Sequence, residues 1–170
     1  MQVEKLSLIL LKTAIFTAVA PFTVGLWFPT QVHRAYDSLT FSPQPSFPCE
    51  IVSWILFGFG AAIYFWCAWD FSVKGLGTPA PIDAPKNLVV NGLYRYLRNP
   101  MYVGVFLLVL SRAVYFWSVP IVVYLLLVAI CANLFILFYE EPHLRKVFGE
   151  QYLDYCHRVP RWIPRIQAAR

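Results

Sequence analysis

Four long apolar stretches alternate with short polar ones along this chain, at about residues 7–28, 51–69, 101–117 and 119–139. A helix needs about 20 predominantly apolar residues to cross the hydrocarbon core of a bilayer, and these runs reach or approach that length. The pattern predicts about four transmembrane helices. Because only a short turn at Ser118 separates the third run from the fourth, the last two should form a tight helical hairpin.

The first apolar run allows a second interpretation. It follows a basic start, and Ala18-Val19-Ala20 has the small-residue form of a signal-peptide cleavage site. The apolar residues continue beyond that site to Phe28, which favours a membrane span. Prolines among polar residues in 29–48 predict a loop before the second run.

The chain after the fourth run carries one apolar stripe at steps of three and four residues, typical of an amphipathic helix. We expect this helix to begin at a break favoured by Glu141-Pro142, because proline disfavours helix before it. It should lie on the membrane surface and end before Pro160. The stripe consists of Leu144, Val147, Phe148, Tyr152 and Tyr155.

Composition agrees with a membrane protein. Hydrophobic residues make up 59% and charged residues 14% of the 170, against about 45–50% and 25% in a soluble domain. The length suits a single domain over residues 1–170. The net charge of +5 is too small to indicate nucleic-acid binding. The basic residues concentrate in the central loop and the tail, so the positive-inside rule places these segments and both termini in the cytoplasm.

The sequence gives little support for a metal site or a dinucleotide-binding site. The four cysteines and three histidines lack the spacing of metal ligands, so no metal is expected. The Gly-rich stretch at 75–78 lacks the strand and helix that flank a dinucleotide fingerprint, and it predicts a turn.

Two polar regions interrupt the apolar pattern, at residues 86–102 and from Glu140 onward. Charge within so apolar a chain indicates function, and we expect the two regions to form one site at one membrane face. Glu140 and Glu141 have two interpretations: they mark the membrane boundary, or they hold a cation, an amine or a sulfonium where the dielectric is low. Pro100 suits a first helical turn, whose free N–H groups and positive dipole end would bind an anionic group.

The order of motifs resembles a known family. The chain contains, in this order, the tripeptide Gly77-Thr78-Pro79, the run NLVVNGLYRYLRNPMYVG from Asn87, a hairpin, and the run EEPHLRKVFGEQYLDYCHRVPRWIP from Glu140. This order resembles that of the isoprenylcysteine carboxyl methyltransferases, to which the phospholipid N-methyltransferases are related. The likeness covers about residues 72–165. It implies an S-adenosylmethionine-dependent methyltransferase whose lipophilic acceptor, a carboxylate, thiol or amine, enters from the bilayer. Methyl transfer would take place at the cytoplasmic face.

The resemblance also assigns residues. Glu140 matches the family's cofactor-binding acid, and Glu141 and Arg98 complete the candidate catalytic set. The other residues that would line the cofactor are Lys86, Asn87, Leu88, Val89, Tyr94, Asn99, Pro100, Met101, Tyr102 and Gly104.

Two positions depart from the family pattern. Asn99 stands where the family usually has histidine, and Ile136 stands where the eukaryotic carboxyl methyltransferases place an arginine for the substrate carboxylate. A carboxylate acceptor therefore loses its obvious partner, and the acceptor stays open. Two alternatives remain: an NADPH-dependent reductase like the sterol reductases, and a membrane scaffold without enzymatic activity.

Overall fold

The computed structural model describes residues 2–36, 47–76 and 86–164, and within these ranges the secondary structure is entirely helical. The elements, in chain order, are α1 (Gln2–Phe22), the π-helical turn η1 (Thr23–Trp27), α2 (Phe28–Tyr36), α3 (Phe47–Val73), the 3-10 helix η3 (Gly92–Arg95), α4 (Pro100–Tyr115), α5 (Val119–Phe135), the π-helical turn η4 (Ile136–Glu140), α6 (Glu141–Phe148) and α7 (Glu150–Arg158).

Three segments are long and apolar enough to cross a membrane: Ser7–Tyr36, Phe47–Val73 and Val119–Phe148. Large apolar side chains on their outer faces are exposed, as lipid contact requires. The predicted third span corresponds to α4, which has 16 residues. At 1.5 Å per residue it is about 24 Å long, shorter than the hydrocarbon core of about 30 Å. The structure thus supports three candidate spans rather than the four predicted.

The helices run past the ends that the sequence suggested. The first apolar segment stays helical to Tyr36, so the loop predicted from Pro29 is wrong over residues 29–36, and the remainder of that loop lies mainly outside the described residues. The break predicted at Glu141-Pro142 is also wrong, because Glu141 has helical dihedral angles and α5, η4 and α6 are continuous.

A π-helical turn explains both continuations. Each turn ends directly before an X-Pro pair, Phe28-Pro29 or Glu141-Pro142, and the N–H of Phe28 or Glu141 donates to the carbonyl five residues back. In a regular α-helix, the proline ring clashes with the carbonyl four residues back and leaves it without a donor. Because a π-turn offsets the hydrogen-bond pattern, we infer that it lets the helix pass the proline.

The C-terminal helix is instead interrupted at Gly149, whose φ of +52° is typical of glycine and ends α6. The single amphipathic helix predicted for this region is therefore not confirmed. Of its apolar stripe, Tyr152 and Tyr155 are buried and Leu144 and Phe148 pack against them, so most of the stripe contacts protein.

Helices α3 and α4 pack closely through two glycines. A Cβ atom on Gly60 would lie 2.8 Å from the carbonyl oxygen of Gly104, and a Cβ on Gly104 would lie 2.9 Å from that of Gly60. Small residues allow this backbone approach between membrane helices. The predicted hairpin of α4 and α5 is confirmed, with Trp117 at a φ of +48° and the N–H of Ser118 donating to the carbonyl of Ala113.

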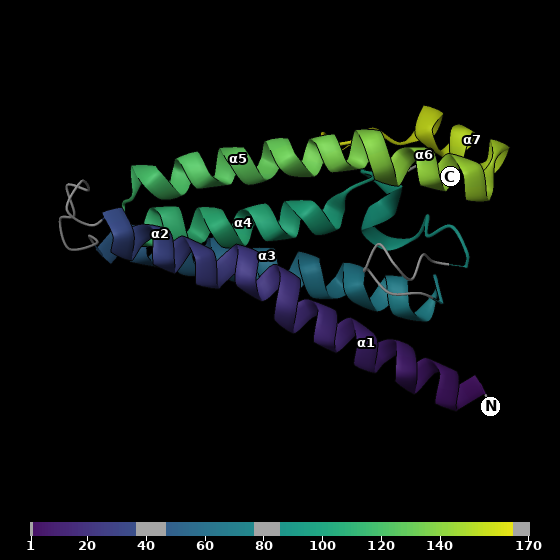
Figure 1. Ribbon diagram of the computed structural model, residues 1–170, viewed down its shortest axis with the longest axis horizontal. Helices are drawn as coiled ribbons and strands as arrows, with labels where there is room; N and C mark the ends of the chain where they lie inside the picture. The colour runs from purple at the N-terminus through teal and green to yellow at the C-terminus, as the bar shows by residue number, and fades with distance from the viewer. Residues whose placement is uncertain (1, 37–46, 77–85, 165–170) are drawn as a thin grey trace.

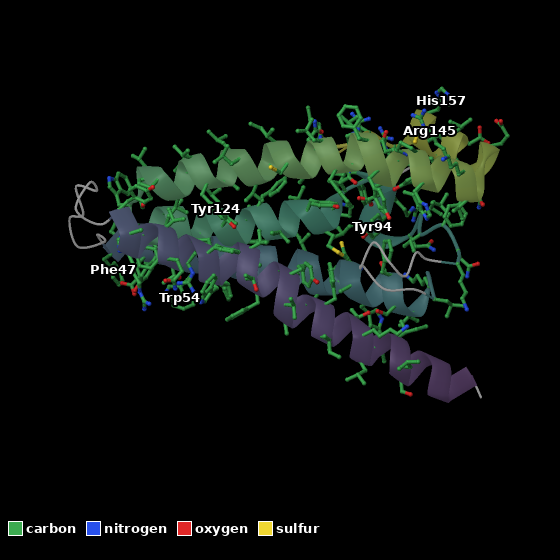
Figure 2. All side chains as sticks on the ribbon, viewed as in Figure 1. Phe47, Trp54, Tyr94, Tyr124, Arg145 and His157 are labelled. Carbon is green, nitrogen blue, oxygen red and sulfur yellow. The ribbon has the colours of Figure 1, made fainter. Side chains whose placement is uncertain are left out.

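Figure 1 shows the arrangement that matters for function. The N-terminus, α6 and α7 lie at one end of the bundle, while α1 diverges from the other helices as it approaches that end. Figure 2 places Tyr94 and Arg145 toward this end, and Phe47 and Trp54 toward the opposite one. We call the first of these the site end.

Candidate functional site

The segment 86–99 is anchored to the site end of α3. The N–H groups of Lys86 and Asn87 donate to the carbonyl of Gly75, at 2.9 and 3.2 Å. Further along the segment, Val89 and Tyr94 are buried in one cluster with Cys67 of α3. Because these contacts fix both the start and the middle of the segment, its polar residues have defined positions relative to the bundle.

The C-terminal region holds this segment from the other side. The Arg98 N–H donates to the carbonyl of Pro160 at 2.9 Å, and the Tyr155 hydroxyl donates to the carbonyl of Tyr94 at 2.8 Å. Burial raises the pKa of both Tyr94 and Tyr155, which keeps the Tyr155 hydroxyl protonated as a donor. The contact predicted between the two polar regions is therefore present.

Glu141 is the centre of a buried ion-pair network. Its side chain is 5% exposed. One oxygen, Oε1, accepts from Arg98 Nη1 at 3.0 Å and Arg161 Nε at 2.8 Å, and Oε2 accepts from Arg161 Nη2 at 3.0 Å. The hydrogen bond to Glu141 raises the pKa of Arg161. Such bidentate, charge-assisted bonds are strong, and they join α6, the start of α4 and the C-terminal segment.

Glu140, the preceding residue, has a different environment. Its Oε2 accepts a hydrogen bond of 2.9 Å from the Tyr102 hydroxyl, and among the described residues no lysine or arginine forms an ion pair with it. Neighbouring helical residues point about 100° apart, so Glu140 faces α4 while Glu141 faces the arginines. The carboxylate of Glu140 thus keeps capacity to accept further hydrogen bonds.

The N-terminus of α4 lies beside this pair. Asn99 is the N-cap residue, but its side chain makes no capping bond and instead donates to the carbonyl of Arg161 at 3.4 Å. The first amides of a helix have no partners within it, and Asn99 gives them no side-chain cap. We therefore expect the N–H groups of Met101 and Tyr102 to be available to an acceptor. Arg98 adds a buried Nε atom that has no hydrogen-bond partner among the described residues.

Trp162 closes one side of the site. Its indole N–H donates to Asn133 Oδ1 on α5 at 3.1 Å, and its ring lies 6.4 Å from that of Tyr102 and 5.8 Å from that of Phe106. The C-terminal segment therefore lies across α4 and α5 next to Tyr102. The sequence does not predict this contact, because nothing local to Trp162 signals a partner on α5.

The predicted site residues divide into two groups. The structure brings five of them together at the junction of α4, η4 and the C-terminal segment: Arg98, Asn99, Tyr102, Glu140 and Glu141. Pro100 begins α4 beside them, and the Met101 side chain packs against the cluster of Cys67, Val89 and Tyr94. Lys86 and Asn87 lie exposed near the end of α3, Leu88 packs against Tyr152 and Tyr155, and Gly104 faces α3. Among the described residues, no group of side chains suits a metal.

Asp70 is a second buried carboxylate that the sequence did not reveal. It is 2% exposed, and its Oδ1 lies 2.6 Å from Lys74 Nζ. A Cβ on Gly92, whose φ is +59°, would collide with the other carboxylate oxygen. Asp70 therefore lies against the turn that leads into η3, and its Oδ2 has no hydrogen-bond partner among the described residues. In the sequence its only signal is an acid at the end of a span.

Comparison with known proteins identifies the family. A family model described as phospholipid methyltransferase matches residues 49–151, which include the first polar region and the start of the second. The chain belongs to this family. The resemblance in the sequence is thereby confirmed, and methyltransferase function in a membrane is the coarse conclusion it supports.

Individual relatives agree. Protein-S-isoprenylcysteine O-methyltransferase of Mus musculus is 36% identical over 93 residues, which cover 49% of this chain and 29% of the mouse protein. Phosphatidylethanolamine N-methyltransferase of Pyrenophora tritici-repentis is 43% identical over 70 residues, or 40% of this chain and 8% of the fungal protein. The chain thus matches less than a third of the length of these relatives. No solved structure matches it.

Proposed function

We propose that this chain is an S-adenosylmethionine-dependent methyltransferase that methylates a lipophilic acceptor at the cytoplasmic face of the membrane. The observation that carries the proposal is the Glu140–Tyr102 pair beside the uncapped N-terminus of α4. The two relatives named above, one an O-methyltransferase and the other an N-methyltransferase, support the reaction class without fixing the acceptor.

The donor set fits this cofactor. S-adenosylmethionine carries an ammonium, a sulfonium and a carboxylate, and when bound it would supply an activated methyl group. Glu140 offers an acceptor of negative charge for the cationic part. The free amides at the start of α4, with the positive end of the helix dipole, suit the carboxylate, and the buried Arg98 Nε atom is a further donor.

The chain's own residues would then act by binding and orientation. Tyr102 donates to Glu140 and so fixes the direction of the carboxylate. Tyr102, Phe106 and Trp162 form an aromatic wall that limits water on this side. Holding the two reactants in line supplies much of the rate enhancement in such a transfer.

Glu141 has a positioning role in this proposal. Both of its oxygens are engaged by arginines, so it holds Arg98 and the C-terminal segment in place and does not contact the cofactor directly. The catalytic role that the resemblance suggested for Glu141 is replaced here by an indirect one. Arg98 would connect Glu141 to the cofactor, because its Nη1 donates to Glu141 while its Nε has no hydrogen-bond partner among the described residues.

The acceptor would reach the site from the bilayer on the side of α5. Close packing between Gly60 and Gly104 leaves no space between α3 and α4 at that level. Ile136 is 1% exposed where an arginine would bind a carboxylate. Arg161 binds Glu141, and the remaining Nε of Arg98 is assigned to the cofactor in this proposal. These contacts favour a thiol or amine acceptor. The basic tail and central loop favour a cytoplasmic site by the positive-inside rule.

Calorimetric titration of the detergent-purified chain with S-adenosylmethionine tests the proposal. The wild type should bind, and Glu140→Gln should weaken binding by about tenfold or more because a charge-assisted contact is lost. Glu150→Gln, which changes an exposed glutamate of α7, is the matched control and should bind like the wild type. Failure of the wild type to bind in two detergents, or equal binding by Glu140→Gln, would contradict the proposal.

A further inference from the structure

A groove separates α1 from α3 on the side of the molecule away from the candidate site. Its volume is about 600 Å³, within the range of about 300–1,000 Å³ typical of small-molecule sites. Ala14, Ala18 and Phe22 of α1 face Phe57, Ala61 and Phe65 of α3 across it. Figure 1 shows that α1 leaves the bundle while α3 continues within it.

The divergence has a local cause. Gly25, in the π-helical turn, approaches Leu108 of α4 so closely that a Cβ there would lie 3.3 Å from the Leu108 Cβ. Pro21 precedes this contact, and kinks in helices arise at prolines and at π-turns. The chain is thus held to α4 at Gly25 and bends away from it toward the N-terminus.

The hydroxyl groups in the groove are already paired. Thr13 and Ser72 share a hydrogen bond of 2.9 Å, which is buried. Thr17 donates to the carbonyl of Thr13 at 2.7 Å and shares a second bond of 3.0 Å with the Tyr64 hydroxyl. These bonds join α1 to α3 along one edge. A buried water needs two to four polar partners, so the remaining, apolar part of the groove is unsuited to water and to a polar ligand.

The position of the groove identifies what can fill it. Its walls belong to Ser7–Tyr36 and Phe47–Val73, two of the candidate membrane spans, and the medium at that depth is lipid hydrocarbon. We propose that the groove binds an acyl chain of a bilayer phospholipid. This lipid is distinct from the methyl acceptor, since α3 stands between the groove and the site: Cys67, on another face of α3, packs against Tyr94.

A phosphatidylcholine with a photoactivatable diazirine in one acyl chain tests this inference in the full chain reconstituted in nanodiscs. Peptide mapping should find adducts concentrated on residues 10–22 and 57–69. Ala61→Phe should reduce them by about tenfold, because the ring occupies the groove. Ala62→Phe is the matched control: Ala62 is the next residue but is exposed and does not line the groove, so its labelling should equal that of the wild type.

Two outcomes would overturn the inference. Adducts spread evenly over outward-facing side chains such as Ile55 and Leu127, and unchanged by Ala61→Phe, would show ordinary lipid contact without a site. If the groove residues are not labelled by the probe and cross-links form between two copies of the chain, a second copy covers the groove. Helical content and S-adenosylmethionine binding of Ala61→Phe, compared with the wild type, exclude misfolding as the cause of lost labelling.

Discussion

Two neighbouring regions of the site end differ in how completely their charges are paired. Around Glu141, three hydrogen bonds from Arg98 and Arg161 engage both carboxylate oxygens. Around Glu140, one residue earlier, the described part of the chain supplies only the Tyr102 hydroxyl, and the N-cap residue of α4 makes no side-chain capping bond. A saturated network holds structure together, whereas an unsaturated one keeps donors and acceptors for a ligand. The comparison leads us to propose that these adjacent identical residues have different roles, because the helix points them apart.

The largest effect should come from Glu141→Gln. Removing the charge leaves Arg98 and Arg161 without their buried counter-ion, and breaking such a pair costs about 3–5 kcal/mol. We expect a lower midpoint of thermal unfolding in detergent and faster proteolysis of residues 149–164. Arg145→Gln is the control, because Arg145 is exposed and lies 3.9 Å from Glu141. Wild-type stability of Glu141→Gln would show that the network is not structural.

Tyr102→Phe tests the unsaturated region. It removes one hydrogen bond to a charged group, worth about 1.5–3 kcal/mol, so S-adenosylmethionine affinity should fall by about tenfold or more. The fold should persist, since the ring still packs against Trp162. Tyr139→Phe, an exposed tyrosine next to Glu140, serves as the control. Equal losses in both variants would argue against a specific Tyr102–Glu140 pair.

Gly104→Ala separates a packing role from a cofactor role. A methyl group at Gly104 would meet the backbone of Gly60 and Tyr64 at 2.9–3.0 Å, and overpacking of this kind costs about 1–3 kcal/mol. The unfolding midpoint should therefore fall. Gly58→Ala is matched to it, because a Cβ there meets nothing within 4 Å. A loss of cofactor affinity at unchanged stability would instead indicate that Gly104 belongs to the cofactor site.

The smallest effect is expected at Trp162. Trp162→Phe leaves the Asn133 amide without its indole donor and should cost about 1 kcal/mol in thermal or chemical unfolding. Replacing both partners, as in Trp162→Phe with Asn133→Leu, should recover most of that loss, since neither polar group then remains unpaired. Additive losses in the double variant would show that the bond contributes nothing.

The sequence predicted those parts of the fold that depend on local pattern. Long apolar runs located the helices of the bundle, and the short turn before Val119 located the hairpin. The family resemblance also predicts that Arg98, Tyr102 and Glu140 belong to one site. Each of these predictions depends on a run of neighbouring residues or on a motif of fixed order.

What the sequence did not predict depends on longer-range geometry. The helix continues through Pro142 because a π-turn precedes it, and propensity alone argues for a break. The break at Gly149 was hidden within a regular apolar stripe. The sequence does not predict the contacts of Arg161 and Tyr155, since their partners, Glu141 and the Tyr94 carbonyl, lie 20 and 61 residues away.

The central claim is that Glu140 binds the cofactor while Glu141 holds the site together. Measuring S-adenosylmethionine affinity and the unfolding midpoint on Glu140→Gln and Glu141→Gln in parallel tests it most directly. We predict that Glu140→Gln loses affinity at near wild-type stability, and that Glu141→Gln loses stability first, with its affinity falling only as the site end loosens. The reverse pattern, with a stable Glu141→Gln that fails to bind and an unstable Glu140→Gln that binds normally, would contradict the account.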